Sequence, residues 1–126
     1  MVTRPRRTRQ KDALRAAFEQ AGRPLSPEEA LAASQQHVDG ISVATVYRNI
    51  NALVAERWLC AVEIPGEPAR YEMAGKGHHH HFHCRSCGRI YDLPGCALPV
   101  GTPVIPSGFQ LSGHELFLYG HCGGCA

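Results

Sequence analysis

The chain has 126 residues, of which 44% are hydrophobic and 19% charged, and its formal net charge is +2. These values are typical of a globular chain with room for one ordinary domain or two very small ones, and they exclude wholesale disorder. No apolar run approaches the roughly 18 residues of a membrane span, and the basic N-terminus lacks the apolar core of a secretory signal. We therefore expect a soluble, cytoplasmic protein.

The composition changes near residue 77. Residues 1–76 hold 11 of the 13 Lys and Arg residues, whereas residues 77–126 hold seven of the eight His and five of the six Cys. The first part is charged and helix-forming, and the second is rich in Gly, Pro and potential metal ligands. We predict two domains with these bounds, 1–76 and 77–126.

The first 15 residues carry six cations against one anion; the cations are Arg4, Arg6, Arg7, Arg9, Lys11 and Arg15. A basic arm of this kind suits a polyanion, most often nucleic acid. On charge alone, a solvated and disordered terminus is an equal alternative.

Three helices are predicted next. Residues 8–21 have apolar side chains at helical spacing. A capping box at residues 26–29, with Pro27 at the first helical position, predicts a second helix as far as about residue 37. Ser42 is suited to cap a third helix. The apolar stripe of that helix consists of Val46, Ile50, Leu53 and Val54.

Two short strands, 58–64 and 69–73, follow around a turn. Three helices and a hairpin in this order are typical of a winged helix-turn-helix, whose third helix enters the major groove of DNA. The basic arm would reach phosphates or the minor groove. The candidate DNA-binding residues are Arg6, Arg7, Thr45, Tyr47 and Arg48. The alternative is a generic three-helix domain in which these are plain surface residues.

The second part contains two C-x-x-C pairs, formed by Cys84, Cys87, Cys122 and Cys125. Two such pairs can close a tetrahedral four-Cys site that has no open position, which predicts one structural Zn²⁺ per chain. That ion would supply stability that a short segment rich in Gly and Pro does not gain from a core. Disulfides or idle thiols are the alternative, which a cytosolic location disfavours.

The His run at residues 78–83 directly precedes the first pair. We predict a strand here, in which His79 and His81 share one face and His78 and His80 share the other. Imidazoles at this spacing suit zinc or another divalent transition metal, so one strand can supply two sites. An affinity tag or a solvated polar strand is the alternative.

Cys60 and Glu72, at the start and end of the predicted wing, are candidates to join His79 and His81 in a regulatory site that straddles the two parts. Filling such a site would fix the angle between the parts and shift the population toward one arrangement. The alternatives are a buried wing position for Cys60 and a plain surface carboxylate for Glu72.

A possible second metal site combines His78 and His80 with His114 and, more weakly, Cys96. The remaining histidines, His37, His83 and His121, are assigned structural or solvated roles.

Four motifs together carry a resemblance: TRQK at 8–11, SVATVYR at 42–48, HHHHFHCRSC at 78–87 and HELFLYGHC at 114–122. From about residue 6 to residue 125 the chain resembles the ferric-uptake-regulator (Fur) family of bacterial metal-dependent repressors. The resemblance implies an α+β protein, with an N-terminal winged helix-turn-helix followed by a small zinc-anchored α/β dimerisation domain. It also implies a homodimer with the corepressor metal at the hinge.

The resemblance implies roles by position. Tyr47 and Arg48 match base-reading residues, and Arg6 matches a residue that enters the minor groove. The four knuckle cysteines match structural zinc ligands. Glu72, His79 and His81 match hinge-site ligands, and His78, His80 and His114 match a second site whose role varies.

Departures from the family pattern suggest the branch. Iron, manganese and peroxide sensors place a hinge-site His where this chain has Pro24. Cys60 falls where zinc sensors place a ligand, and a thiolate beside imidazoles favours zinc. Another ligand that zinc sensors often carry is replaced by Ala74, so Glu72 must serve instead. The chain therefore most resembles zinc uptake regulators (Zur).

Pro99 stands where the family usually has a carboxylate of the second site, so either Cys96 substitutes or that site is absent. Residues 94–106 are also too rich in proline for the long helix that the family builds there. We expect the dimer interface to rest on a strand at residues 113–119 instead.

The expected function is a zinc-responsive repressor of metal-uptake genes that binds palindromic double-stranded DNA operators as a dimer. An iron- or manganese-responsive repressor, using Fe²⁺ or Mn²⁺, is the alternative. A zinc buffer without DNA binding is disfavoured by the basic arm, and a metal-dependent hydrolase by the lack of a motif such as H-E-x-x-H. We expect no enzymatic activity, no small-molecule substrate and no membrane association.

Overall fold

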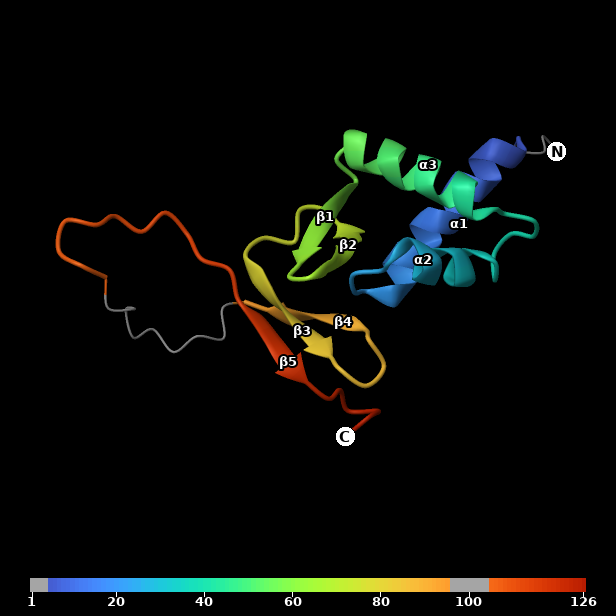
Figure 1. The fold of residues 1–126 in the computed structure, drawn as a ribbon. Coiled ribbons are helices and arrows are strands. Elements are labelled where there is room, and N and C mark those ends of the chain that lie inside the picture. The colour runs from blue at the N-terminus through green and yellow to red at the C-terminus, as the bar shows by residue number, and fades with distance from the viewer. Residues whose placement is uncertain (1–4, 96–104) are drawn as a thin grey trace. The chain divides into compact units, whose positions relative to one another are not determined.

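The computed structural model describes residues 5–95 and 105–126. Within these ranges the elements are α1 (Arg6–Ala21), α2 (Pro27–Ser34), α3 (Val43–Ala55), β1 (Leu59–Ile64), β2 (Glu67–Met73), β3 (His79–Cys84), β4 (Ile90–Pro94) and β5 (Phe117–Gly120) (Figure 1). The chain divides into two compact units, Met1–Lys76 and Gly77–Ala126. The predicted α+β class is confirmed. No helix in the described ranges has the length and apolar character needed to cross a membrane.

Local sequence signals set the ends of the helices. Gly22 ends α1 in the left-handed conformation, with φ at 61°. The predicted capping box is present at α2: the Ser26 hydroxyl accepts from Glu29 N at 3.1 Å, and the Glu29 carboxylate accepts from Ser26 N at 3.0 Å. The Ser42 hydroxyl caps α3 by accepting from Thr45 N at 3.2 Å. The three predicted helices are confirmed.

Two helix bounds differ from the prediction. α1 begins at Arg6, two residues earlier than expected. α2 ends at Ser34 rather than near His37. The Ser34 hydroxyl donates back to Leu31 O at 3.0 Å, and His37 N donates to Ser34 O at 2.9 Å. The backbone bond of His37 N, and that of Gln36 N to Ala33 O at 3.3 Å, reach back three residues rather than four, so the chain continues as a tighter turn.

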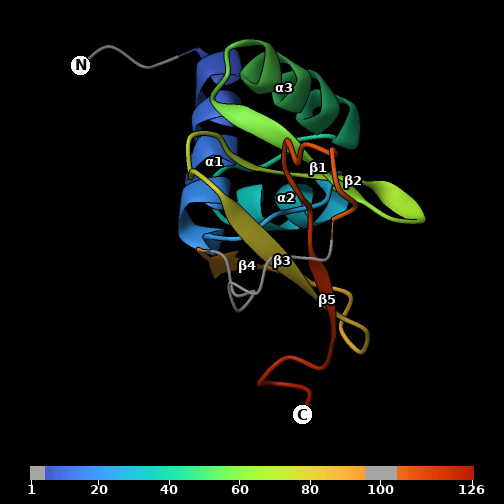
Figure 2. The same ribbon diagram turned by 90° about the vertical axis from the view of Figure 1, so that its left-hand side faces the viewer.

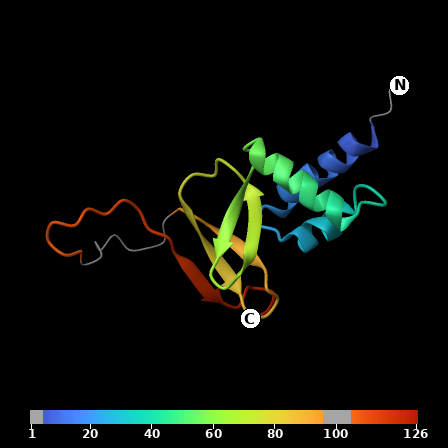
Figure 3. The same cartoon turned by 45° about the horizontal axis from the view of Figure 1, so that its top comes forward.

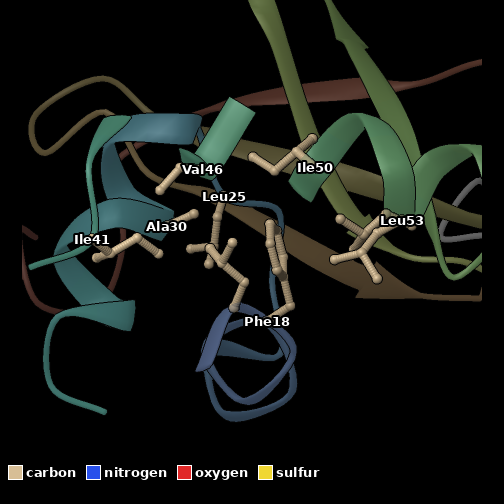
Figure 4. Packing of buried hydrophobic residues seen from close by; sticks show 9 residues of the cluster. Phe18, Leu25, Ala30, Ile41, Val46, Ile50 and Leu53 are labelled. Atoms are coloured by element: carbon tan, nitrogen blue, oxygen red, sulfur yellow. The ribbon is translucent and has the colours of Figure 1, made fainter. Parts of the chain in front are cut away.

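The three helices share one apolar core (Figure 4). Its buried members are Leu14, Phe18, Leu25, Ala30, Ile41, Val46, Ile50, Leu53 and Leu59. From α3, Val46, Ile50 and Leu53 are buried as the stripe predicts, whereas Val54 packs at the edge. This packing leaves the opposite face of α3, including Tyr47 and Arg48, exposed.

The two strands of the wing lie antiparallel, side by side (Figure 3). Their register pairs Cys60 with Glu72 and becomes irregular between Val62 and Ile64. Leu25 and Tyr71 exchange backbone hydrogen bonds of 2.8 and 2.9 Å, which attach β2 to the segment before α2. The unit is thus a three-helix bundle with a hairpin fixed to it.

The second unit is a three-stranded sheet in the order β4-β3-β5 (Figure 2). β3 pairs antiparallel with β4 and parallel with β5. In the described part of this unit only His80, Cys84 and Ile90 are buried. With so little buried apolar surface, the sheet needs another source of stability.

β5 is shorter than the strand predicted at residues 113–119. The parallel ladder starts only at Phe117, opposite His81. Just before it, His114 contacts the rings of His78 and His80 instead of joining the ladder. Most of the proline-rich stretch 94–106 lies outside the described residues.

Candidate metal centres and nucleic-acid interface

Four thiols meet at one end of the second unit. We call residues 84–87 the first knuckle and residues 122–125 the second knuckle. The sulfurs of Cys84, Cys87, Cys122 and Cys125 all lie within 4.8 Å of one another. No disulfide joins the described cysteines. The cluster therefore fits one tetrahedral ion held by four sulfurs.

Strand pairing and tight turns bring the two knuckles together. β3 ends at Cys84, which stands opposite Gly120 at the end of β5. Gly88 N donates to Cys84 O at 2.9 Å and Gly88 has a φ of 77°, a conformation that glycine adopts without strain. Cys122 N donates to Cys84 Sγ at 3.3 Å. Backbone N–H groups of both chain segments therefore bind Cys84, one at its carbonyl oxygen and one at its buried sulfur.

The environment of the thiols prepares one of them for a metal. Hydrogen bonds from the backbone of Cys87 and then Cys122 lower the pKa of Cys84 to about 5. The hydrogen bond with Tyr91 lowers the pKa of Cys122. Interactions with Cys122 and Cys84 raise the pKa of Cys125 to about 12. A metal that binds all four sulfurs must therefore displace at least one proton.

Three imidazoles converge near the start of β3. His114 Nε2 lies 3.2 Å from His78 Nε2 and 3.2 Å from His80 Nε2. Burial lowers the pKa of His80, and the neighbouring histidines lower it further. A neutral imidazole is the form that ligates, so this group is suited to a divalent ion. Cys96, the weaker candidate for this site, lies outside the described residues.

The opposite face of β3 carries a third group of potential ligands. His79 and His81 point to this face, and their Nε2 atoms lie 3.6 and 3.3 Å from Asp92 Oδ1. Asp92 stands directly opposite His81 in the β3–β4 ladder. This carboxylate is not among the ligands predicted from the sequence. Pairing the two strands through the first knuckle, with His81 opposite Asp92, would have found it.

The two wing candidates face each other in the first unit. Cys60 and Glu72 are register partners on β1 and β2, so their side chains share one face of the hairpin. Lys76 Nζ donates to the Glu72 carboxylate, with 3.4 Å between Nζ and Oε2. A thiol and a carboxylate at paired positions supply two ligand types from one hairpin.

The remaining histidines make other contacts. His37 lies 3.2 Å from Gln20 Oε1, and the rings of His83 and Tyr119 are 5.7 Å apart. His121 Nδ1 lies 2.7 Å from the Ser86 hydroxyl.

The cations of the first unit fall into two groups. Lys11, Arg15, Arg23, Arg70 and Lys76 each contact a carboxylate. In contrast, none of Arg6, Arg7, Arg9, Arg48 and Arg57 has a carboxylate partner within the described ranges. No carboxylate in the described part of the chain therefore compensates their charge.

Three of these uncompensated arginines line one cavity. It has a volume of about 640 Å³ and is lined by Arg6, Arg7, Gln10, Thr45, Arg48 and Asn49. Arg6 donates to Gly40 O at 3.2 Å, and Arg48 donates to Thr45 Oγ1 at 3.0 Å. The start of α1 and the exposed face of α3 thus form one positive surface. Such a surface attracts phosphate groups.

Tyr47 lies on the same exposed face of α3, with 44% of its surface accessible. Its hydroxyl donates to Glu28 Oε1 at 3.4 Å, and the charge of Glu28 raises the pKa of Tyr47. The phenol therefore stays protonated at neutral pH and presents a ring and a hydroxyl to solvent.

The four-thiol cluster, the histidine clusters and the positive face of α3 are the features expected of a metal-dependent DNA-binding protein, and the comparison with known proteins agrees. The model of the ferric uptake regulator family matches residues 3–119. The chain belongs to the ferric uptake regulator family. Members of this family are DNA-binding transcription regulators and not enzymes, which confirms that the chain is not an enzyme.

One relative within the family is longer than this chain. The ferric uptake regulation protein of Campylobacter jejuni is 34% identical over 87 residues. That match covers 68% of this chain and 55% of the relative, so the chain spans about half the length of this relative.

Two solved structures share the fold. The Helicobacter pylori ferric uptake regulator Fur, described as having three functional metal binding sites, is 26% identical with a TM-score of 0.63, covering 92% of this chain and 79% of that one. FurB from M. tuberculosis, a zinc uptake regulator, is 25% identical with a TM-score of 0.52, covering 96% and 95%. These likenesses agree with the family given by the family model and do not select the metal.

Proposed function

We propose that the protein is a metal-responsive repressor that binds an operator in double-stranded DNA as a homodimer. The observation that carries this proposal is a group of arginines around the exposed face of α3 that have no carboxylate partner among the residues the structure describes. Arg6, Arg7 and Arg48 supply phosphate contacts, and Thr45 and Tyr47 lie beside them for contacts with base edges. A dimer would bind a palindromic operator with two such surfaces.

The four cysteines are proposed as the ligands of a structural Zn²⁺. The support is the mutual distance of their sulfurs, within 4.8 Å, and the lowered pKa of Cys84. When bound, the ion cross-links the two chain segments beyond the end of the β3–β5 ladder. A four-sulfur site has no open position and therefore no catalytic role.

The regulatory ion is proposed to bind His79 and His81, with Asp92 added to the predicted ligands. Cys60 and Glu72 remain the other predicted ligands of this ion. Two imidazoles and a carboxylate suit several divalent metals, including Fe²⁺ and Mn²⁺. The thiolate of Cys60 is what favours Zn²⁺, so the choice of zinc depends on this one residue.

His78, His80 and His114 are proposed as a second, separate site. The short distances between their Nε2 atoms support three ligands without a contribution from Cys96. Three imidazoles without a carboxylate favour zinc over the harder ions.

The test is operator binding with and without metal. An operator is first selected from random duplexes, and gel shifts then compare the chelator-treated chain with and without Zn²⁺, Fe²⁺ or Mn²⁺. We expect zinc to raise affinity about 5- to 150-fold, which corresponds to about 1–3 kcal/mol of coupling. Cys60→Ala and His79→Ala should lose this response and remain dimeric, whereas the control His37→Ala should keep it.

Each other outcome has a definite meaning. Restoration of binding by iron or manganese as well as by zinc would contradict the zinc assignment. A normal zinc response in Cys60→Ala would remove Cys60 from the site. A zinc buffer would show no salt-dependent retention on DNA at all, whereas a protein that binds phosphates loses affinity steeply as salt rises.

A further inference from the structure

The second knuckle is held against the first by contacts other than those of the cysteines. The second knuckle lies at the end of the described chain, and β5, the strand that leads to it, has only four residues. Backbone pairing of β3 with β5 ends at Cys84 and Gly120. Any group that holds the second knuckle in place must therefore act beyond the end of this ladder.

Three contacts that involve no sulfur continue where the ladder stops. Arg85 N donates to Gly120 O at 2.8 Å. The guanidinium of Arg85 lies 4.7 Å from the centre of the Tyr119 ring, close enough for a cation–π interaction. The Ser86 hydroxyl and His121 Nδ1 are 2.7 Å apart, which is a short hydrogen bond between side chains.

The Ser86–His121 contact occupies a particular position. Ser86 stands between the two cysteines of the first knuckle, and His121 directly precedes the first cysteine of the second. A hydroxyl bound to Nδ1 also fixes the orientation of the imidazole ring. The pair therefore joins the two halves of the four-sulfur cluster without using any sulfur.

We propose that Ser86 and His121 are positioning residues of the four-cysteine zinc site, whose hydrogen bond keeps the second knuckle against the first. This inference rests on the proposed structural zinc. The pair orders Cys122 relative to Cys84 before the ion binds and slows its release afterwards. Outer groups of this kind typically change metal affinity by about 10- to 100-fold. Because both side chains are exposed, we expect the lower end of that range.

The experiment measures how fast zinc leaves the full-length chain. Protein loaded with zinc is mixed with an excess of a chromogenic chelator, and the absorbance of the zinc–chelator complex is followed. Two variants are compared, Ser86→Val and Ser86→Thr. The valine and threonine side chains have nearly the same shape, but only threonine keeps the hydroxyl. We expect about tenfold faster release for Ser86→Val and nearly wild-type release for Ser86→Thr.

The partner residue is tested in the same way. His121→Ala should match Ser86→Val, and the double variant should release zinc no faster than either single variant. His121→Asn places an acceptor near the position of Nδ1 and should recover most of the loss. His37→Ala, at another exposed histidine bonded to a side chain, serves as the control.

Two results separate the possible failures. Equal, wild-type release rates for the valine, threonine and alanine variants would overturn the role of the pair while leaving the zinc site intact. If the wild-type chain retains no zinc, or if Cys84→Ser retains as much, the proposed structural site fails instead. Unchanged unfolding of the first unit, followed by the fluorescence of Trp58, shows that a faster release is not a general loss of stability.

Discussion

Glu29 connects three parts of the first unit through one carboxylate. It accepts from Ser26 N in the capping box, and it contacts Arg23 at 3.0 Å and Arg70 at 3.1 Å. Partial burial raises the pKa of Glu29, but the Ser26 hydrogen bond and the charge of Arg23 outweigh burial and lower it. The ionised form is therefore the one that stabilises the start of α2 and its link to the wing.

The pH dependence at this residue follows from the sign of the shift. Because the pKa is lower in the folded chain than in the unfolded chain, the stabilisation is present above the unfolded pKa and is lost as pH falls through the folded value. Glu29→Gln should lower the free energy of unfolding by about 1 kcal/mol at pH 7. The difference from wild type should shrink in acid below the unfolded pKa. Urea unfolding followed by Trp58 fluorescence measures it, and a difference that is constant with pH would contradict the prediction.

At the scale of the element, β5 depends on the absence of a side chain at Gly120. A Cβ at this position would lie 3.0 Å from Phe82 Cζ, a tight contact that requires the ring to move by a few tenths of an ångström. Phe82 stands on β3, and its pairing partner on β5 is Leu118. Gly120 thus lets the aromatic ring cover the end of the short strand directly before the second knuckle.

Gly120→Ala should shift the Phe82 ring by a few tenths of an ångström and destabilise the second unit by about 1 kcal/mol, the low end of the usual cost of overpacking, because only the far edge of the ring is in the way. Thermal unfolding of the zinc-loaded chain, followed by the absorbance of a zinc-sensitive dye, reports this loss. Gly113→Ala is the matched control, because a Cβ there meets nothing within 4 Å. Equal stability of the two variants would show that Phe82 adjusts without cost.

At the scale of the whole molecule, the two units differ in what stabilises them. The first unit has its own apolar core around Phe18, Ile50 and Leu53. In the described part of the second unit, the buried apolar side chains are Cys84 and Ile90. The ion bound by four sulfurs would therefore supply much of the folding free energy of the second unit.

Removal of zinc should consequently unfold one unit and spare the other. A strong chelator, or Cys84→Ala, should abolish the protection of β3–β5 amides against hydrogen exchange and promote precipitation or loss of the dimer. Amides of α1 and α3 should stay protected, because their core contains no metal ligand. Loss of protection in both units at the same chelator concentration would contradict this division.

Sequence alone determined the features that depend on neighbouring residues. Helix starts at Ser26 and Ser42, the alternation of the His run and the paired C-x-x-C spacing are local signals, and the fold class and family followed from them. The tertiary structure decided what depends on strand register: Asp92 beside His79 and His81, and the late start of β5. It also decided which arginines find carboxylates, since those partners lie as far as 41 residues away. The physical reason is that caps and turns act within a few residues, whereas ligand sets and ion pairs form only after distant segments have packed.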